Sequence, residues 1–534
     1  MLSKVYTAAI SGINAYPVTV ETDISHGLPA MYTVGLPSAT IREARERVRS
    51  ALINSGCDFP MQRITINLSP AAKRKEGSHF DLPMAIGILA SNGSIESSNL
   101  KDAGFFGELS LDGRLIAVKG ALPLAMGMKE SGVRRVVFPA ANAAEASMVN
   151  GLDIIPAYNL SEVVAYLMGK KKIIIYNNEK IVKNEDKFDM DFSDVAGQYA
   201  AKRAIMIAAA GGGHGIYLSG APGSGKTMLA RRIPTVMPEL SYEEKLELTK
   251  IYSISGLLGE NEPFIEKRPF RMPYHAVTPA ALLGGGHIPK PGEISLAHCG
   301  VLFLDEFPEF DKKIIELLRQ PMEEGEVSVE RADGRVTYPA SFMFVAAGNP
   351  CKCGYFGDSA HRCICSGNEL RNYQSKLSGP IADRIDIQVI VEKAQAEELE
   401  MRGEIGAAEN SARSATIENT GMGRSDCLRS SAAMREVVSY ALDVQKDRYK
   451  NESDALLTNA KLTGRLVAKY CPLDSSGKEL LRNAYEKLGI SARAYEKVIK
   501  VARTIADIEG EENIRDFHIA EALGYRVLDR IYRN

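Results

Sequence analysis

One stretch of this sequence restricts its fold more than any other: GIYLSGAPGSGKTMLARRI, residues 215–233. Residues 220–227 fit the pattern G-x-x-x-x-G-K-S/T, with a short apolar run before it and a helical run after it. Glycines let successive backbone N–H groups turn toward phosphate groups, and the following helix adds its positive end. The pattern predicts a phosphate-binding loop between a strand and a helix of an α/β domain. A Gly-rich turn that binds nothing is the weaker interpretation.

Side chains of this loop have separate expected tasks. Lys226 would place a positive charge on the β- and γ-phosphates, and the Thr227 hydroxyl is suited to coordinate Mg²⁺. The residues expected to bind ATP in this loop are Gly220, Ala221, Pro222, Gly223, Ser224, Gly225, Lys226, Thr227 and Met228.

Two acidic residues follow an apolar strand about 80 residues further on, in GVLFLDEF, residues 300–307. Ligands bind at the carboxyl ends of strands in open α/β sheets. Asp305 would complete the Mg²⁺ shell, and Glu306 would polarise the attacking water as general base. Two acids at the end of one strand are common, but together with the phosphate loop they predict hydrolysis of a nucleoside triphosphate.

Three further polar residues are candidates for the same chemistry. Asn349 ends the apolar run SFMFVAAGNP, where its carboxamide could orient water, although a turn-forming Asn before Pro350 is the plainer interpretation. Arg384 lies in LSGPIADRIDIQV; such an arginine is usually in a surface ion pair, but it also suits an arginine finger for a neighbouring subunit's nucleotide. Arg493, near the start of a C-terminal helix, is a candidate for a further phosphate contact.

Changes in apolar periodicity, charge and polarity along the chain divide it into five segments. Residues 1–168 predict a mixed α/β domain, with strands in RITINLSP and RRVVFPA and a hairpin at the Asp-Gly pair of ELSLDGRLIAV. Residues 169–190 are charged and predict a linker, whereas 191–393 form a second α/β block. Residues 394–428 are polar and predict a flexible connector. The 3.6-residue apolar period of residues 429–534 predicts a helical domain.

Net charge and hydropathy limit the class of protein and the cellular compartment to be expected. Sixty-five Lys and Arg stand against 67 Asp and Glu, so a polybasic protein is excluded and any nucleic-acid contact must come from a local patch. No apolar run approaches the ~20 residues that cross a bilayer, and the N-terminal MLSKVYTAAISGINAY does not read as a signal peptide. We therefore expect a cytoplasmic protein with no membrane partner.

Four of the eight cysteines, Cys351, Cys353, Cys363 and Cys365, fall within fifteen residues. Two Cys-x-Cys pairs could place four thiolates around Zn²⁺, with His361 as a substitute ligand, and a shell closed by four protein ligands would be structural. The alternative is a set of reduced thiols in a Gly-rich loop. Disulfides are disfavoured because the cytosol keeps thiols reduced.

The order of these elements resembles that of the AAA+ ATPases. The sequences of several segments are similar to those of the magnesium-chelatase-like branch, above all the bacterial YifB/ComM family. The likeness runs almost end to end and is carried by DFSDVAGQYAAKRAIMIAAAGGGHG, RPFRMPYHAVTPAALLGGGHIPKPGEISLAHCGVLFLDE and SARAYEKVIKVARTIADIEG. It implies an AAA+ αβα core with a helical lid, a homo-hexameric ring, and ATP with Mg²⁺ as cofactors. In that ring Asn349 would be sensor 1, Arg384 the arginine finger and Arg493 sensor 2.

The same resemblance implies that Asp194, Val195 and Gln198 border the adenine pocket. This chain departs from the family at Tyr274 and Gly215, where a His and an Asn are usual. These departures bear on local packing and leave the expected ATPase unchanged.

Two insertions bear on the substrate. The stretch LLGGGHIPKPGEISLAH, with three consecutive glycines and two prolines, cannot continue a helix, and the Asp-Gly pair in EGEVSVERADGRVTYPAS predicts a hairpin. In the resembling family such elements line the pore of the ring. Lys290, Arg331 and Arg335 would then reach the phosphates of single-stranded or branched DNA with salt-dependent affinity. A solvated hairpin with ordinary surface charge is the alternative.

The N-terminal block resembles the S5-domain-2-like α/β fold of the Lon-protease C-terminal domain, through GELSLDGRLIAVKGALPLAM and SGVRRVVFPAAN. Lon needs a Ser nucleophile and a Lys base within hydrogen-bond reach. The alignment puts these positions at or near His79 and at Leu124, while Ser78 and Lys119 are out of register. We expect a domain without a proteolytic dyad that serves ring assembly or substrate guidance.

Three classes of function remain at this point. The first is an ATP-driven ring motor on DNA; here the resemblance implies a branch-migration helicase that extends heteroduplex during natural transformation. The second is a magnesium-chelatase-type ATPase that remodels a protein partner, although no DxSxS stretch suggests its integrin-like metal-binding domain. The third, an ATP-dependent protease, is disfavoured by the missing Ser-Lys register.

Overall fold

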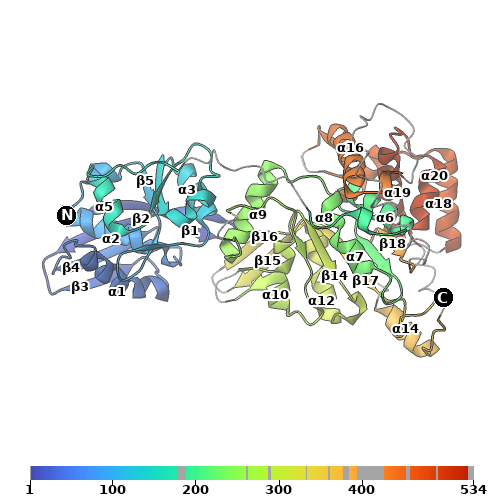
Figure 1. Cartoon of the computed structure of the whole chain (residues 1–534), viewed down its shortest axis with the longest axis horizontal. Coiled ribbons are helices and arrows are strands. Elements are labelled where there is room, and N and C mark those ends of the chain that lie inside the picture. The colour runs from blue at the N-terminus through green and yellow to red at the C-terminus, as the bar shows by residue number, and fades with distance from the viewer. Residues whose placement is uncertain are drawn as a thin grey trace.

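The computed structural model describes residues 2–176, 188–259, 263–286, 290–331, 334–358, 361–376, 384–393, 426–452, 457–488 and 491–526. Half of the predicted linker and most of the predicted connector lie outside these residues. Three bodies follow one another along the long axis of the molecule: an N-terminal sheet domain, a central sheet domain and a C-terminal helical domain (Figure 1).

The N-terminal domain is built on a seven-stranded sheet in the order β3-β4-β2-β1-β5-β8-β9. A long antiparallel hairpin of β1 and β2 occupies its middle, and parallel strands extend it on the β5 side. The strands are β1 (Ser3–Ser11), β2 (Asn14–Ser25), β3 (Ala30–Val34), β4 (Arg63–Ser69), β5 (Ala103–Phe105), β8 (Arg135–Pro139) and β9 (Asp153–Ala157). The predicted Asp-Gly hairpin is confirmed as β6 (Glu108–Leu109) and β7 (Leu115–Ile116).

Helices cover this sheet and bury its apolar residues. They are α1 (Ala39–Asn54), α2 (Asp81–Ser91), α3 (Ala121–Glu130), α4 (Ala143–Ala146) and α5 (Leu160–Leu167). Helix α2 is buried along its whole length, which explains why its sequence DLPMAIGILAS is apolar all round. The mixed α/β character predicted for this block is therefore confirmed.

The central domain holds a five-stranded parallel sheet in the order β11-β14-β17-β10-β18. Its strands are β10 (Ile216–Ser219), β11 (Phe270–Arg271), β14 (Val301–Leu304), β17 (Met343–Gly348) and β18 (Ile387–Ile390). The helices around it are α6 (Tyr199–Ala210), α7 (Lys226–Arg231), α8 (Ile233–Val236), α9 (Tyr242–Ser255), α10 (Pro279–Leu283), α11 (Glu293–Leu296), α12 (Lys312–Leu317), α13 (Arg319–Glu324) and α14 (Gly367–Ser375). Every residue of β10, β14 and β17 is buried, as the continuous apolar runs predict.

Two small hairpins interrupt the central domain. Strands β12 (Gly284–Gly285) and β13 (Lys290–Pro291) pair in the Gly-rich insertion. A Cβ at Gly284 would lie 2.3 Å from the carbonyl oxygen of Lys290, so this close pairing requires a glycine. Strands β15 (Glu326–Arg331) and β16 (Gly334–Pro339) form the second predicted hairpin, and the first residue of its Asp-Gly pair lies outside the described residues.

The C-terminal domain is helical, as predicted. It comprises α16 (Ser431–Tyr449), α17 (Arg465–Tyr470), α18 (Ser475–Leu488), α19 (Ala492–Ile508) and α20 (Asp516–Gly524). Helices α16 and α19 pack on α6, and their apolar residues join those of the central sheet in one hydrophobic cluster. Among the described residues, no helix combines the length and the apolar character that a bilayer crossing demands.

Candidate functional site

The predicted phosphate loop connects β10 to α7, at the carboxyl edge of the central sheet. Gly223 and Gly225 have φ angles of +76° and +92°, a left-handed conformation that glycine adopts without strain. The ammonium group of Lys226 donates hydrogen bonds to the carbonyl oxygens of Gly220 at 2.8 Å and Ala221 at 2.9 Å. Burial lowers the pKa of Lys226, against the opposing charges of Asp305 and Glu306. The loop thus holds a cation against two of its own backbone carbonyl groups.

Residues from three strands meet at this loop. The Lys226 ammonium lies 3.3 Å from Oδ1 of Asn349, which follows β17, and the Thr227 hydroxyl donates to Oδ2 of Asp305 at 2.6 Å. A hydroxyl and a carboxylate oxygen are hard donors of the kind Mg²⁺ prefers. Within the described part of the chain, the buried hydroxyl of Ser224 has no hydrogen-bond partner, so it suits a phosphate oxygen. These residues fit ATP with Mg²⁺.

Glu306 follows Asp305 in a strained conformation, with φ of +51°. Its side chain is 64% exposed, so the carboxylate is open to a water molecule, as a general base requires. Nδ1 of His275 lies 4.0 Å from its Oε2. We did not single out His275 from the sequence; the available signal was its place just after β11, the neighbour of β14 in the sheet.

The residues predicted to border adenine lie together beside α7. Asp194 pairs with Arg232, which ends that helix, at 2.9 Å, and Val195 is buried. Gln198 donates to the backbone carbonyl of Glu392, just past the carboxyl end of β18. The turn formed by residues 191–198 therefore lies at the same edge of the sheet as the phosphate loop.

Arg384 and Arg493 are placed differently. Arg384 comes just before β18, which runs parallel to β10 with Ile387 opposite Ile216, so it lies at the amino edge of the sheet. Its guanidinium pairs with the carboxylate of Glu323 on α13. Arg493 is exposed at the start of α19, one turn before Lys497.

The predicted DNA-binding residues lie on the two small hairpins. Lys290 in β13 and Arg335 in β16 are exposed, and the Arg335 guanidinium donates to the Ser328 hydroxyl across the hairpin at 2.9 Å. The backbone of Arg331 ends β15, whereas its side chain is outside the described part of the structure.

The four clustered cysteines meet directly after Asn349, and their sulfur atoms all lie within 4.8 Å of one another. The predicted substitute ligand, His361, is not part of this group. Its Nδ1 lies 3.6 Å from Oδ1 of Asp358, and its ring stacks on Tyr355.

The N-terminal positions aligned with a protease dyad hold two buried side chains, His79 and Leu124. Nε2 of His79 donates to the carbonyl oxygen of Ala8 at 3.0 Å, and burial lowers the pKa of this imidazole to about 4. A neutral, enclosed imidazole with its N–H engaged is a packing group rather than a nucleophile.

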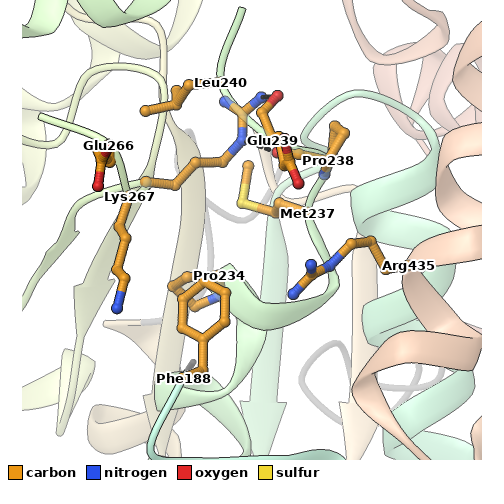
Figure 2. Close-up of a pocket in the computed structure, with 10 residues that line it drawn as sticks. Phe188, Pro234, Met237, Pro238, Glu239, Leu240, Glu266, Lys267 and Arg435 are labelled. Carbon is orange, nitrogen blue, oxygen red and sulfur yellow. Dashed lines mark hydrogen bonds between the residues drawn. The ribbon is translucent and has the colours of Figure 1, made fainter. Parts of the chain in front are cut away.

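Another pocket lies where the central domain meets α16 (Figure 2). Phe188 lies between two cations, with the Lys267 ammonium 5.3 Å and the Arg435 guanidinium carbon 5.4 Å from its ring centre. Pro234 and residues 237–240 and 266–268 complete the wall. Through Phe188 and Arg435, the residues around this pocket link the segment just before the central domain to the lid helix α16. The phosphate-loop residues do not line the pocket.

Comparisons with known proteins agree with this geometry. Family models match three parts of the chain: subunit ChlI of Mg-chelatase over residues 20–142, magnesium chelatase subunit ChlI over 191–399, and the ChlI C-terminal part over 428–526. The competence protein ComM of Haemophilus influenzae is 40% identical over 99% of this chain and 98% of its own length.

Two other relatives show how far this similarity extends. The YifB protein of Escherichia coli is also 40% identical, again over 99% of this chain and 98% of its own. The magnesium-chelatase 67 kDa subunit of Chlorobaculum tepidum is 30% identical, but over only 30% of this chain and 23% of its own. With its phosphate loop, its Asp-Glu strand, Asn349 beside that loop and its helical lid, the chain belongs to the YifB/ComM family of magnesium-chelatase-like AAA+ ATPases.

Proposed function

We propose that this chain is an ATP-driven motor that assembles into a hexameric ring and acts on DNA, as a branch-migration helicase that aids recombination in natural transformation. The single observation that carries the ATPase part is the meeting of Lys226, Thr227, Asp305 and Asn349 at one edge of a parallel sheet. When bound there, Mg²⁺ would neutralise phosphate charge next to Thr227 and Asp305. Glu306 would take a proton from the attacking water, and Asn349 would orient that water.

The ring is supported by the positions of the two candidate arginines. Parallel strands of four residues span about 13 Å at ~3.3 Å per residue, and this length separates Arg384 from the phosphate loop of its own chain. Arg493 lies one turn before Lys497, which bonds Asp386 at the same amino edge. Both arginines would therefore serve a neighbouring subunit's nucleotide, after Arg384 exchanges Glu323 for a phosphate.

The DNA substrate is supported by charge and by similarity. Lys290 and Arg335 are exposed cations on the two small hairpins. In a chain whose net charge is −2, a DNA contact needs such local positive charge. A protein named competence protein is 40% identical over nearly the whole length. The turn between β1 and β2 also reaches the second hairpin, since a Cβ at Gly12 would lie 3.3 Å from Val336. The N-terminal domain is thus in contact with an element proposed to bind DNA.

The direct test measures ATP hydrolysis with and without forked or four-way DNA across a salt series. We expect stimulation by DNA that falls steeply with salt, because phosphate contacts release counterions. Lys226→Ala should abolish nucleotide binding, and combined Lys290→Ala and Arg335→Ala should remove the stimulation but keep the basal rate. Hydrolysis indifferent to every DNA would favour a magnesium-chelatase-type motor on a protein partner, and no hydrolysis at all would contradict the proposal.

A mixing experiment tests action between subunits. Arg384→Ala and Glu306→Gln should each be inactive, the first for lack of a finger and the second for lack of a base. In a mixed ring, an intact Arg384 from the Glu306→Gln subunit can serve the intact base of its neighbour, so partial activity should return. A mixture that stays inactive although both variants assemble would argue against catalysis in trans.

A further inference from the structure

The turn after Asn349 brings four sulfur atoms into one cluster. Sγ of Cys351 lies 3.3 Å from that of Cys353 and 3.7 Å from that of Cys363, and the Cys353 and Cys363 sulfurs are 3.6 Å apart. Four sulfurs around Zn²⁺ at ~2.3 Å stand about 3.8 Å from one another. A disulfide would bring a pair to about 2.05 Å. The spacings fit separate thiolates around one ion.

Backbone groups complete the environment of a thiolate cluster. The N–H of Phe356 donates to Sγ of Cys351 at 3.3 Å, and the N–H of Cys353 donates to Sγ of Cys365 at 3.4 Å. Such N–H···S bonds orient the ligands and stabilise their negative charge. Four sulfur donors select a soft or borderline ion such as Zn²⁺ over Mg²⁺, and they leave no coordination position for water.

The cluster also touches the nucleotide loop. Gly354 lies between the two cysteine pairs with φ of +88°, and a Cβ there would lie 2.6 Å from Cδ of Pro222. Asn349, two residues before Cys351, meets Lys226. The cysteine turn therefore contacts the phosphate loop through Pro222 and, by way of Asn349, through Lys226.

We propose that Cys351, Cys353, Cys363 and Cys365 bind one structural Zn²⁺ ion, and that this ion holds Asn349 and the Gly354 turn against the phosphate loop. The zinc assignment stands on the cysteine geometry alone. The effect on the phosphate loop rests on the proposed ATP site, so the two parts are tested separately.

The first experiment measures metal in the full-length protein purified without added chelator. We expect about one zinc per chain, released by a mercurial thiol reagent and detected with a chromogenic chelator. Co²⁺ added to the apoprotein should give the visible and thiolate charge-transfer bands of a tetrahedral four-sulfur site. Cys353→Ser should lose the metal, whereas Cys57→Ser, at a cysteine far from the cluster in sequence, should keep it.

Three results would overturn the zinc assignment: folded protein purified with no bound metal, equal zinc content in Cys353→Ser and Cys57→Ser, or cobalt spectra without thiolate bands. If Cys353→Ser fails to fold, chelation of the wild-type protein decides instead. Metal extracted by a strong chelator without any change in thiol reactivity would also contradict the site.

The second experiment separates the metal from its proposed effect. Gly354→Ala should keep its zinc but bind a fluorescent ATP analogue about tenfold more weakly, because the new methyl group overlaps Pro222. Gly357→Ala is the matched control: its φ is +80° in the same turn, and a Cβ there meets nothing within 4 Å. Equal ATP affinity in the two variants would overturn the coupling. Zinc present in a protein that binds no ATP would instead refute the proposed nucleotide site and leave the metal site intact.

Discussion

The central sheet domain meets its two neighbours through different chemistry. Toward the lid it buries charge: Asp386 lies 3.3 Å from Nδ1 of His214 and 2.5 Å from the ammonium group of Lys497 on α19, and the other imidazole nitrogen meets Thr504 at 3.0 Å. Burial by itself would raise the pKa of Asp386, but Lys497 and His214 hold it well below its usual range. An apolar cluster shared by sheet and lid surrounds this network.

Toward the N-terminal domain the contacts are mostly neutral. The hydroxyl of Tyr242 on α9 donates to the carbonyl oxygen of Met148 at 2.7 Å, and the Ser253 hydroxyl donates to Glu145 at 2.5 Å. Leu246 and Phe264 add a half-buried apolar contact to a cluster that belongs to the N-terminal domain. This cluster is separate from the one shared by the sheet and the lid.

The difference indicates two folding units. A buried ion pair is costly to break from one side, since it leaves a charge without its partner, so sheet and lid should unfold together. Neutral contacts at a domain boundary can open at smaller cost. The network of Asp386, His214 and Lys497, which we call the charged join, includes residues two positions from Arg384 and one turn from Arg493. A rigid lid would therefore fix both arginines for the neighbouring subunit.

The largest expected effect is on the charged join. Lys497→Met should destabilise the unit of sheet and lid by about 3–5 kcal/mol, because Asp386 stays buried with its charge. Hydrogen exchange during denaturant unfolding should show α16 and α19 opening earlier, with β1 and β2 unchanged. Lys487→Met, at an exposed lysine of α18, is the control and should change stability by less than about 0.5 kcal/mol. A similar small loss in Lys497→Met would mean that the network does not hold the lid.

The second prediction uses pH to separate the units. Because burial lowers the pKa of His79 to about 4, the folded N-terminal domain excludes a proton that the unfolded chain binds near pH 6.5. The contribution of His79 to the stability of this domain should be constant above about pH 6.5 and fall by up to about 3 kcal/mol as the pH drops toward 4. Asp81, whose pKa burial raises to about 6, contributes in the opposite direction, so the His79 effect is measured as a difference between variants. Thermal unfolding at several pH values measures this slope.

His79→Gln keeps a group that can donate to Ala8 and removes the titration, so the difference in stability between the variant and the wild type should change by up to about 3 kcal/mol between pH 6.5 and 4. The unit of sheet and lid should keep its own acid sensitivity, since burial also lowers the pKa of His214. An unchanged N-terminal slope in the variant would show that another group causes it.

Motifs that are local in sequence could be predicted from it. The phosphate loop, the Asp305-Glu306 pair, Asn349 and both Asp-Gly hairpins all depend on neighbouring residues and on strands long enough to show an apolar run. The cysteine cluster was predicted for the same reason. His361, predicted as a substitute ligand, lies outside the cluster, because its position depends on contacts such as the one with Asp358.

Features that depend on sheet order could not be predicted. Strands β1 and β2 at the middle of the N-terminal sheet were not identified, since polar and aromatic residues break up the apolar alternation of AYPVTVETDIS. Asp386 is 172 residues from His214 and 111 from Lys497, so only the packed structure shows that they meet. Which edge of the sheet holds Arg384 likewise follows from the position of β18 beside β10.

The smallest expected effect is on the neutral join, by which we mean the contacts of α9 with the N-terminal domain. Ser253→Ala should cost about 1 kcal/mol, because Glu145, whose pKa is raised by burial, keeps a second donor in the N–H of Leu122. The matched control is Ser255→Ala, two residues further along α9. The Ser255 hydroxyl donates to the carbonyl oxygen of Ile251 in the same helix. Hydrogen exchange should become faster in α4 for the first variant alone, without a change in α16 or α19. If Ser253→Ala instead destabilised the lid as strongly as Lys497→Met, the N-terminal domain would belong to the same folding unit, and the contrast between the two joins would fail.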